Sequence, residues 1–214
     1  MIGKLMLTLA LETSTSQGSL ALFDGEALLE SYHFQALRGH NSKIYRPLES
    51  MLDVLGDRRL DRLVVGTGPG SYTGVRIAIA IADALALSHG AALIGCCSMI
   101  AAKLGETEEH YWVAGDARRD SWYRAEVRSG ALVGELITES RELWESAVDE
   151  ALAANVPVRT FDPKSPLVGV EIDVPTAERL GRVSQSMSAN ARPLEPTYLA
   201  PPYITTPKKT GKVL

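Results

Sequence analysis

The first half of the chain alternates short apolar runs with polar turns, a pattern that predicts strands followed by helices. Apolar residues dominate 4–11, 18–23 and 27–34, and Asp24-Gly25 between the last two runs is typical of a β-hairpin turn. A helix ending at Gly56 should follow. Its apolar residues recur on one helical face, namely Ile44, Leu48, Met51, Leu52 and Leu55.

A glycine-rich segment divides the next two predicted elements. A buried strand at 60–65 leads into Gly66-Thr-Gly-Pro-Gly-Ser-Tyr-Thr-Gly74, and a long helix then runs to about residue 88. Another short strand is predicted at 91–94. Ser98 is then expected to cap a helix that ends at Gly105.

The second half repeats this order of elements. A strand at 111–115 ends at Asp116, just as the first strand ends at Glu12, and a hairpin follows with its turn at Ser129-Gly130. A helix capped by Ser140, a strand and a last helix complete the half, the last two expected at 167–170 and 176–187. Two halves with one order of elements predict a duplicated α/β protein. A tandem of ribonuclease-H-like units fits that order.

We therefore divide the chain into three parts. Residues 1–106 form the first ribonuclease-H-like unit, residues 107–191 a second and shorter one, and residues 192–214 a proline-rich tail. The tail carries Lys208, Lys209 and Lys212 with no acid after Glu195, and we expect extended chain there.

Composition excludes several classes of protein. The 214 residues are 45% hydrophobic and 22% charged, as in globular rather than disordered chains. The net charge of −4 gives no global electrostatic reason to bind nucleic acid. The longest apolar run contains Asp83 and is too short to span a bilayer, and the adjacent Cys96 and Cys97 favour a reducing compartment. We expect a cytoplasmic protein without membrane contact.

The glycine-rich segment is a candidate anion site, because backbone amides at a helix N-terminus can hold a phosphate. Gly68, Gly70 and Ser71 lie at this point. The segment matches neither the P-loop nor the dinucleotide-binding spacing. The alternative is structural, since glycine also lets a turn bend and a helix approach its neighbour closely.

The helix after this segment carries a stripe of small residues. Gly74, Ala78, Ala82 and Ala86 recur every four residues, and Ile77, Ile81 and Leu85 flank them. A helix that is apolar nearly all round is buried on more than one side. The stripe therefore allows close approach of a helix from a partner, or packing within this chain.

Glu12 and Asp116 each end an initial strand, a position where ribonuclease-H-like proteins often carry a functional carboxylate. The favoured alternative is that each acid accepts hydrogen bonds from the turn that follows. The four histidines are not spaced as a helical metal pair, and no serine or cysteine motif marks a nucleophile. We predict no metal site and no catalytic residue in this chain.

Four segments together resemble the bacterial TsaB (YeaZ) family. They are Leu11-Glu-Thr-Ser-Thr15, Gly66-Thr-Gly-Pro-Gly-Ser-Tyr-Thr-Gly-Val-Arg-Ile77, Asp116-Ala-Arg-Arg-Asp-Ser-Trp-Tyr123 and Pro196-Thr-Tyr-Leu199. The resemblance implies an actin/Hsp70/sugar-kinase type fold of two ribonuclease-H-like subdomains. It also implies a part in making threonylcarbamoyladenosine next to the anticodon of tRNAs that read codons starting with A.

The resemblance implies that, in this pathway, the chain is a non-catalytic partner of a TsaD-like transferase, together with a TsaE-like ATPase. It implies a homodimer, tRNA contact only through the complex, and no cofactor bound by the chain alone, with ATP or ADP allowed in the assembled complex. A weak nucleotide site would use Glu12, Gly68, Gly70, Ser71 and Asp116. The family also places subunit pairing on first-unit helices, which adds the interface residues Gly74, Ile77, Ala78, Ile81, Ala82, Leu85 and Ala86.

The chain departs from the family and its paralogue at a few positions. Glu12 stands where Asp is more frequent, and Ala200 stands where an arginine is common. His40 is present where the catalytic paralogue has a metal-binding histidine, but Ile44 replaces the second one. Two other functions stay open: a nucleotide-dependent phosphotransferase or ATPase of the same superfold, and a homodimeric regulatory module without a tRNA connection.

Overall fold

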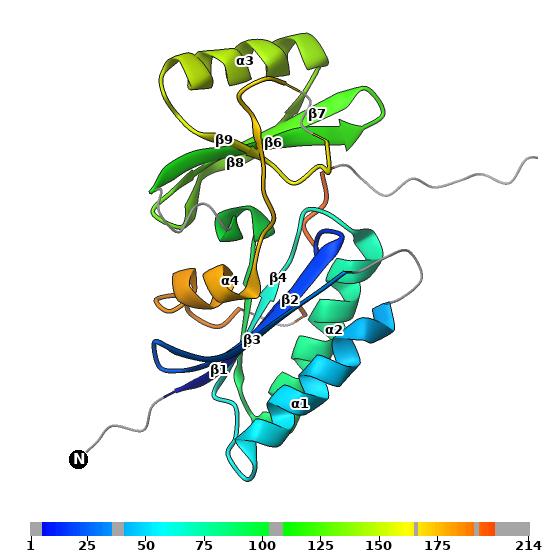
Figure 1. Ribbon diagram of the computed structural model, residues 1–214, viewed down its shortest axis with the longest axis vertical. Coiled ribbons are helices and arrows are strands. Elements are labelled where there is room, and N and C mark those ends of the chain that lie inside the picture. Colours follow the sequence, from blue (N-terminus) through cyan, green and yellow to red (C-terminus); the bar gives the residue numbers. More distant parts are fainter. Residues whose placement is uncertain (1–5, 36–40, 103–108, 165–166, 191–192, 200–214) are drawn as a thin grey trace, which may run out of the picture.

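The computed structural model describes residues 6–35, 41–102, 109–164, 167–190 and 193–199. The chain forms two five-stranded sheets, each with helices on its faces, stacked along the long axis of the molecule (Figure 1). The tail lysines, Ala200 and His40 lie outside the described residues. No helix in the described part of the chain has the length and apolar character needed to cross a membrane.

The first sheet has the strand order β3-β2-β1-β4-β5. Its strands are β1 (Leu7–Glu12), β2 (Gln17–Asp24), β3 (Ala27–Gln35), β4 (Arg62–Gly66) and β5 (Ala92–Cys96). The first three strands are antiparallel, while β4 pairs in parallel with both β1 and β5. Both faces of β1 are buried, which explains why four of its six residues are apolar: Leu7, Leu9, Ala10 and Leu11.

The second sheet repeats that order as β8-β7-β6-β9-β10. Its strands are β6 (His110–Arg118), β7 (Ser121–Arg128), β8 (Ala131–Glu139), β9 (Val158–Thr160) and β10 (Glu171–Ile172). Again the first three strands are antiparallel and the last two join in parallel. Both sheets therefore have the ribonuclease-H-like topology, and the predicted tandem fold is confirmed.

Helices cover these sheets in three groups. They are α1 (Tyr45–Leu55), α2 (Tyr72–His89), α3 (Arg141–Ala153) and α4 (Ala177–Val183), with the 3₁₀ turns η1 (Asn41–Ile44) and η2 (Ser98–Ala101). Helices α1 and α2 share one core with the first sheet, and α3 packs on the outer face of the second. A third core joins the two sheets and includes η2 and α4 (Figure 1).

Several predicted elements are confirmed, and three are wrong. Both hairpins form, and α1 ends before Gly56 as expected. The helix expected after Ser98 is only the short turn η2, because the Ser98 hydroxyl accepts a hydrogen bond from the Gly68 amide instead of capping a helix. The strand expected at 167–170 is a turn, and the short strand β9 was not predicted. Helix α4 ends at Val183, four residues before the predicted end at Met187.

Helix α4 packs against the first sheet, although its residues were predicted to belong to the second unit. It contacts β1, β2 and β4. A side chain at position 181 would collide with the Phe23 ring, so Gly181 allows the helix to lie this close. At its C-terminal end, Arg62 of β4 donates hydrogen bonds to the carbonyls of Ser184 (2.5 Å), Gln185 (3.1 Å) and Met187 (3.2 Å). Arg62 is only 5% exposed, so these bonds give partners both to its buried guanidinium and to the carbonyls at the end of the helix.

Candidate functional site

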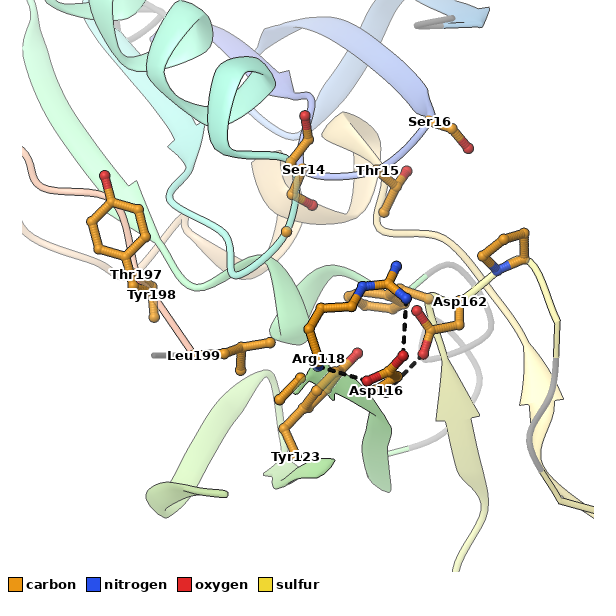
Figure 2. A pocket seen from close by; sticks show the side chains of 15 residues that line it. Ser14, Thr15, Ser16, Asp116, Arg118, Tyr123, Asp162, Thr197, Tyr198 and Leu199 are labelled. Atoms are coloured by element: carbon orange, nitrogen blue, oxygen red, sulfur yellow. Dashed lines mark hydrogen bonds and ion pairs between the residues drawn. The ribbon is translucent and has the colours of Figure 1, made fainter. Parts of the chain in front are cut away.

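A cavity of about 450 Å³ lies between the two sheets, at the ends of their first strands. Three walls enclose it (Figure 2). The first is the β1–β2 turn with the start of α2, the second combines the end of β6, the start of β7 and residues 161–163 after β9, and the third is the segment 197–199. The residues of the predicted nucleotide site that line it are Gly70, Ser71 and Asp116. Gly68 and Glu12 do not line it.

Close backbone packing builds the first wall. The Ser71 amide donates to the Ser14 carbonyl at 2.6 Å, and the Thr13 hydroxyl donates to the Gly74 carbonyl at 2.8 Å. A side chain at Gly70 would collide with the Ser14 carbonyl, and one at Gly74 with the Thr13 carbonyl. The glycines therefore let the start of α2 touch the β1–β2 turn, and the structural explanation accounts for them.

Glu12 is fully buried behind this wall, which corrects its place in the predicted nucleotide site. Its Oε1 accepts the Ser14 amide at 2.6 Å, and Gly66 leaves room for the carboxylate by having no side chain. Burial, the largest effect, raises the pKa of Glu12, while hydrogen bonds from Ser14 and Ser98 lower it. With 0% exposure, the side chain cannot reach a ligand in the cavity.

Asp116 lies on the opposite wall, and its carboxylate is already engaged (Figure 2). Oδ1 accepts the Arg118 amide at 2.6 Å, and Oδ2 pairs with the Arg118 guanidinium at 2.9 Å. Asp162 accepts the Asp116 amide at 2.9 Å and brings a second carboxylate to the cavity. Because Arg118 neutralises only one of the two acids, this wall carries a net negative charge.

Tyr123 contributes a hydroxyl beside these acids. Burial is the main cause that raises its pKa, and Asp162 and Asp116 raise it further. The hydroxyl therefore stays protonated at neutral pH and can donate a hydrogen bond to a ligand.

The segment 197–199 forms the third wall and connects it to α2. The Thr197 amide donates to the Thr67 carbonyl at 2.7 Å, and the Tyr198 ring stacks on Tyr72 with centroids 5.8 Å apart. The Tyr198 hydroxyl accepts hydrogen bonds from Arg76 at 3.1 and 2.9 Å. Sequence reasoning did not assign this segment, Tyr123 or Asp162 to a site, although Pro196-Thr-Tyr-Leu199 is one of the four segments that carry the family resemblance.

The small-residue stripe of α2 faces the protein's own sheet. Gly74, Ala78, Ala82 and Ala86 are buried within the single chain, the three alanines in the core with β1 and β4. The prediction that these four residues contact another subunit is therefore wrong. Ile77, Ile81 and Leu85 are half-buried, so their part in an interface stays a prediction.

Two potential metal ligands, Asp116 and Asp162, line the cavity. Within the described ranges, no group of three His, Cys, Asp or Glu side chains is placed to hold a metal ion. Ile44, at the position of the paralogue's second histidine, is 1% exposed and belongs to the core of the first unit.

Comparison with known proteins identifies relatives in tRNA modification. The family described as "TsaD: tRNA N6-adenosine threonylcarbamoyltransferase" matches residues 34–171. The tRNA threonylcarbamoyladenosine biosynthesis protein TsaB of Escherichia coli (strain K12) is 34% identical over 130 residues, which are 58% of this chain and 55% of that protein. The protein of the same name from Haemophilus influenzae is 34% identical over 128 residues, 56% of this chain and 52% of its own.

Solved structures agree along most of the chain. YeaZ from Pseudomonas aeruginosa superposes with a TM-score of 0.67 at 25% identity, covering 91% of this chain and 100% of that one. The alignments with the curated E. coli and H. influenzae proteins, by contrast, span about half of those proteins' lengths.

Proposed function

The chain belongs to the TsaD-type protein family and, within it, to the TsaB (YeaZ) proteins, and from this premise we propose that it supports tRNA threonylcarbamoyladenosine biosynthesis as a non-catalytic partner of a TsaD-like transferase. The modified base would be the adenosine next to the anticodon in tRNAs that read codons starting with A. The chain would position the transferase rather than carry out the chemistry.

The observation that carries this proposal is the state of the two strand-end acids. Glu12 is sealed in the core and bonded to the Ser14 amide, and Asp116 is bonded to the Arg118 amide and guanidinium. A general base must reach the proton that it removes with a free lone pair. Glu12 cannot reach one, and Asp116 would have to give up or share the hydrogen bonds that both of its oxygens accept from Arg118.

The assembly we propose contains further components. A TsaE-like ATPase would join the transferase and this chain in the cytoplasm, ATP or ADP would bind in the assembled complex, and tRNA would bind through the complex. The chain would pair with itself when the transferase is absent. Ile77, Ile81 and Leu85, the half-buried residues of α2 beside the stripe, are the remaining predicted contacts for either partner.

A second candidate is a nucleotide-dependent phosphotransferase or ATPase. The cavity between the two sheets favours it, since Gly70 and Ser71 bring the N-terminus of α2 to one wall. The acids Asp116 and Asp162 on the facing wall oppose it, because they would repel the phosphates of a nucleotide bound without a cation. Calorimetric titration with ATP and ADP distinguishes the candidates, since tight binding with turnover by the isolated chain would favour the enzyme.

Co-purification with the transferase, followed by a tRNA modification assay with and without this chain, tests the proposal. Modification should require the chain, and Asp116→Asn should leave its rate within a few fold of normal. A drop of about a hundredfold, or about 2.7 kcal/mol of barrier, would assign Asp116 a catalytic part and refute the non-catalytic role. Modification at the normal rate without the chain would refute the proposal as a whole.

A further inference from the structure

A second cavity, of about 520 Å³, lies on the first unit between β3 and the start of α1, away from the cleft between the sheets. Strand β3 is an edge strand, because the sheet order leaves it one neighbour only. Most of its side chains are exposed. We call this cavity the β3–α1 groove.

Two aromatic rings line the groove from the same face of β3. Tyr32 and Phe34 are two residues apart, and their ring centroids lie 6.5 Å apart with the planes tilted by 30°. Tyr32 is 46% exposed, so one face of an aromatic pair is open to solvent. Phe34 is anchored beneath it, because its ring packs against Gly18 in the core of the first unit.

Two cations face these rings from the other side of the groove. Lys43 of η1 and Arg46 of α1 line it and are exposed. Neither forms an ion pair or a hydrogen bond with any residue that the structure describes. Elsewhere a set of arginines is paired with carboxylates, namely Arg58, Arg118, Arg124, Arg128, Arg141 and Arg159.

The described lining of the groove contains no carboxylate. His33 also lines the groove, and its Nε2 is bonded at 2.6 Å to Glu178 of α4, on the face of β3 opposite Tyr32. Glu30 shares the face of Tyr32 and does not reach the lining. A protein with a net charge of −4 thus carries a local site with two cations and two aromatic rings, and no acid of the described lining offsets that charge.

We propose that the β3–α1 groove binds single-stranded RNA, with a base stacked on Tyr32 and flanking phosphates held by Lys43 and Arg46. Sites for single-stranded nucleic acid combine two features: cations placed along the phosphate backbone, and aromatic rings on which the bases stack. The inference rests on the proposed function only in choosing RNA over DNA. It adds direct binding of RNA by this chain to the binding of tRNA by the complex.

The rings favour RNA over an acidic peptide as the occupant. Lys43 and Arg46 alone would suit either polyanion, but an exposed ring gains more from a flat base than from an aliphatic carboxylate side chain. A second copy of this chain is also disfavoured, since the groove presents uncompensated positive charge to an identical positive groove.

Fluorescence anisotropy of the full chain with a short labelled single-stranded RNA tests the proposal across a salt series. The Lys43→Ala/Arg46→Ala double variant should reduce the slope of log Kobs against log salt by about 1.4, because each neutralised phosphate of a single strand contributes about 0.7 to that slope. Tyr32→Ala should weaken binding about fivefold or more and leave the slope unchanged, because stacking involves no counterion.

The matched control is Arg59→Ala/Lys164→Ala, which removes two exposed cations from other surfaces and should leave the slope unchanged. An equal change of slope in this control, no RNA binding at low salt, or equal binding of polyglutamate by the groove would each overturn the proposal. Thermal unfolding of every variant confirms that it is folded.

The modification assay with the same variants separates this inference from the proposed function. If the groove variants lose RNA binding but modification proceeds without the chain, the proposed function is refuted and the inference stands. If modification requires the chain but the groove variants bind RNA as tightly as the wild type does, only the inference is refuted.

Discussion

Replacing Ala82 by leucine tests whether the small-residue stripe of α2 is a core element or a subunit interface. Ala82 is completely buried in the single chain, where the helix meets the first sheet. Interiors are packed so closely that extra carbon atoms force side chains or backbone to move. If the stripe were an interface instead, the added bulk would change binding and leave the folded monomer intact.

The expected cost follows from this packing. Adding methylene groups to a packed core costs about 1–3 kcal/mol of unfolding free energy. For a protein of this size each kcal/mol lowers the melting temperature by about 2–4 °C, so Ala82→Leu should melt about 2–12 °C lower. Ala84 is exposed on the opposite side of the same helix, and Ala84→Leu should change the unfolding free energy by no more than about 0.5 kcal/mol.

Calorimetric melting and binding to the transferase, measured on the same two variants, complete the experiment. Ala82→Leu should lower the melting temperature and leave affinity per folded molecule unchanged. Equal melting temperatures for the two variants, or an Ala82→Leu protein of normal stability that no longer binds its partner, would refute the assignment of the stripe to the core.

Three further changes probe the interior. Because burial raises the pKa of Glu12, the unfolded chain loses the carboxyl proton at lower pH than the folded protein does. The stability of the wild type relative to Glu12→Gln should therefore fall as the pH rises above about 4.3, which denaturant titrations at several pH values would detect. Arg62→Met should leave the carbonyls just after α4 without this donor and cost about 1–3 kcal/mol, with faster amide exchange in α4. The exposed control Arg58→Met should not change that exchange. Gly66→Ala should destabilise the protein by displacing the Glu12 carboxylate, and an unchanged melting temperature would show that this close approach is unimportant.

Local chemistry made much of the fold predictable from the sequence. The Ser129-Gly130 turn forms as predicted, and both residues adopt the positive φ angles that such turns need (47° and 74°). The first hairpin also forms, but its turn is Gly25-Glu26, one residue after the predicted Asp24-Gly25, because Asp24 is the last residue of β2 and pairs with Ala27. The repeated order of elements therefore predicted the tandem fold correctly. The separation of Glu12 from the cavity was not predictable in the same way, because its burial depends on Gly66 and Ser98, far along the chain.

The predictions that failed depend on interactions between distant segments. Ser98 has the side chain of a helix cap, but its hydroxyl bonds the Gly68 amide, thirty positions earlier. Strand β9 has only three residues, too few for a periodic signal, and the sheet forms it by pairing with β6. The small-residue stripe fits a partner helix or a sheet equally well, so periodicity alone could not choose between them.

The path of the chain after β10 explains why the predicted boundary between 106 and 107 does not separate two independent cores. The Thr176 amide bonds the Ala101 carbonyl as the chain returns to the first unit, and Asn190 bonds β5 through the Leu93 carbonyl and the Gly95 amide. Thr197 then pairs with Thr67 at the cleft. Residues that follow the second sheet thus complete the first unit and close the cavity. A movement of one unit relative to the other would therefore strain or break these hydrogen bonds.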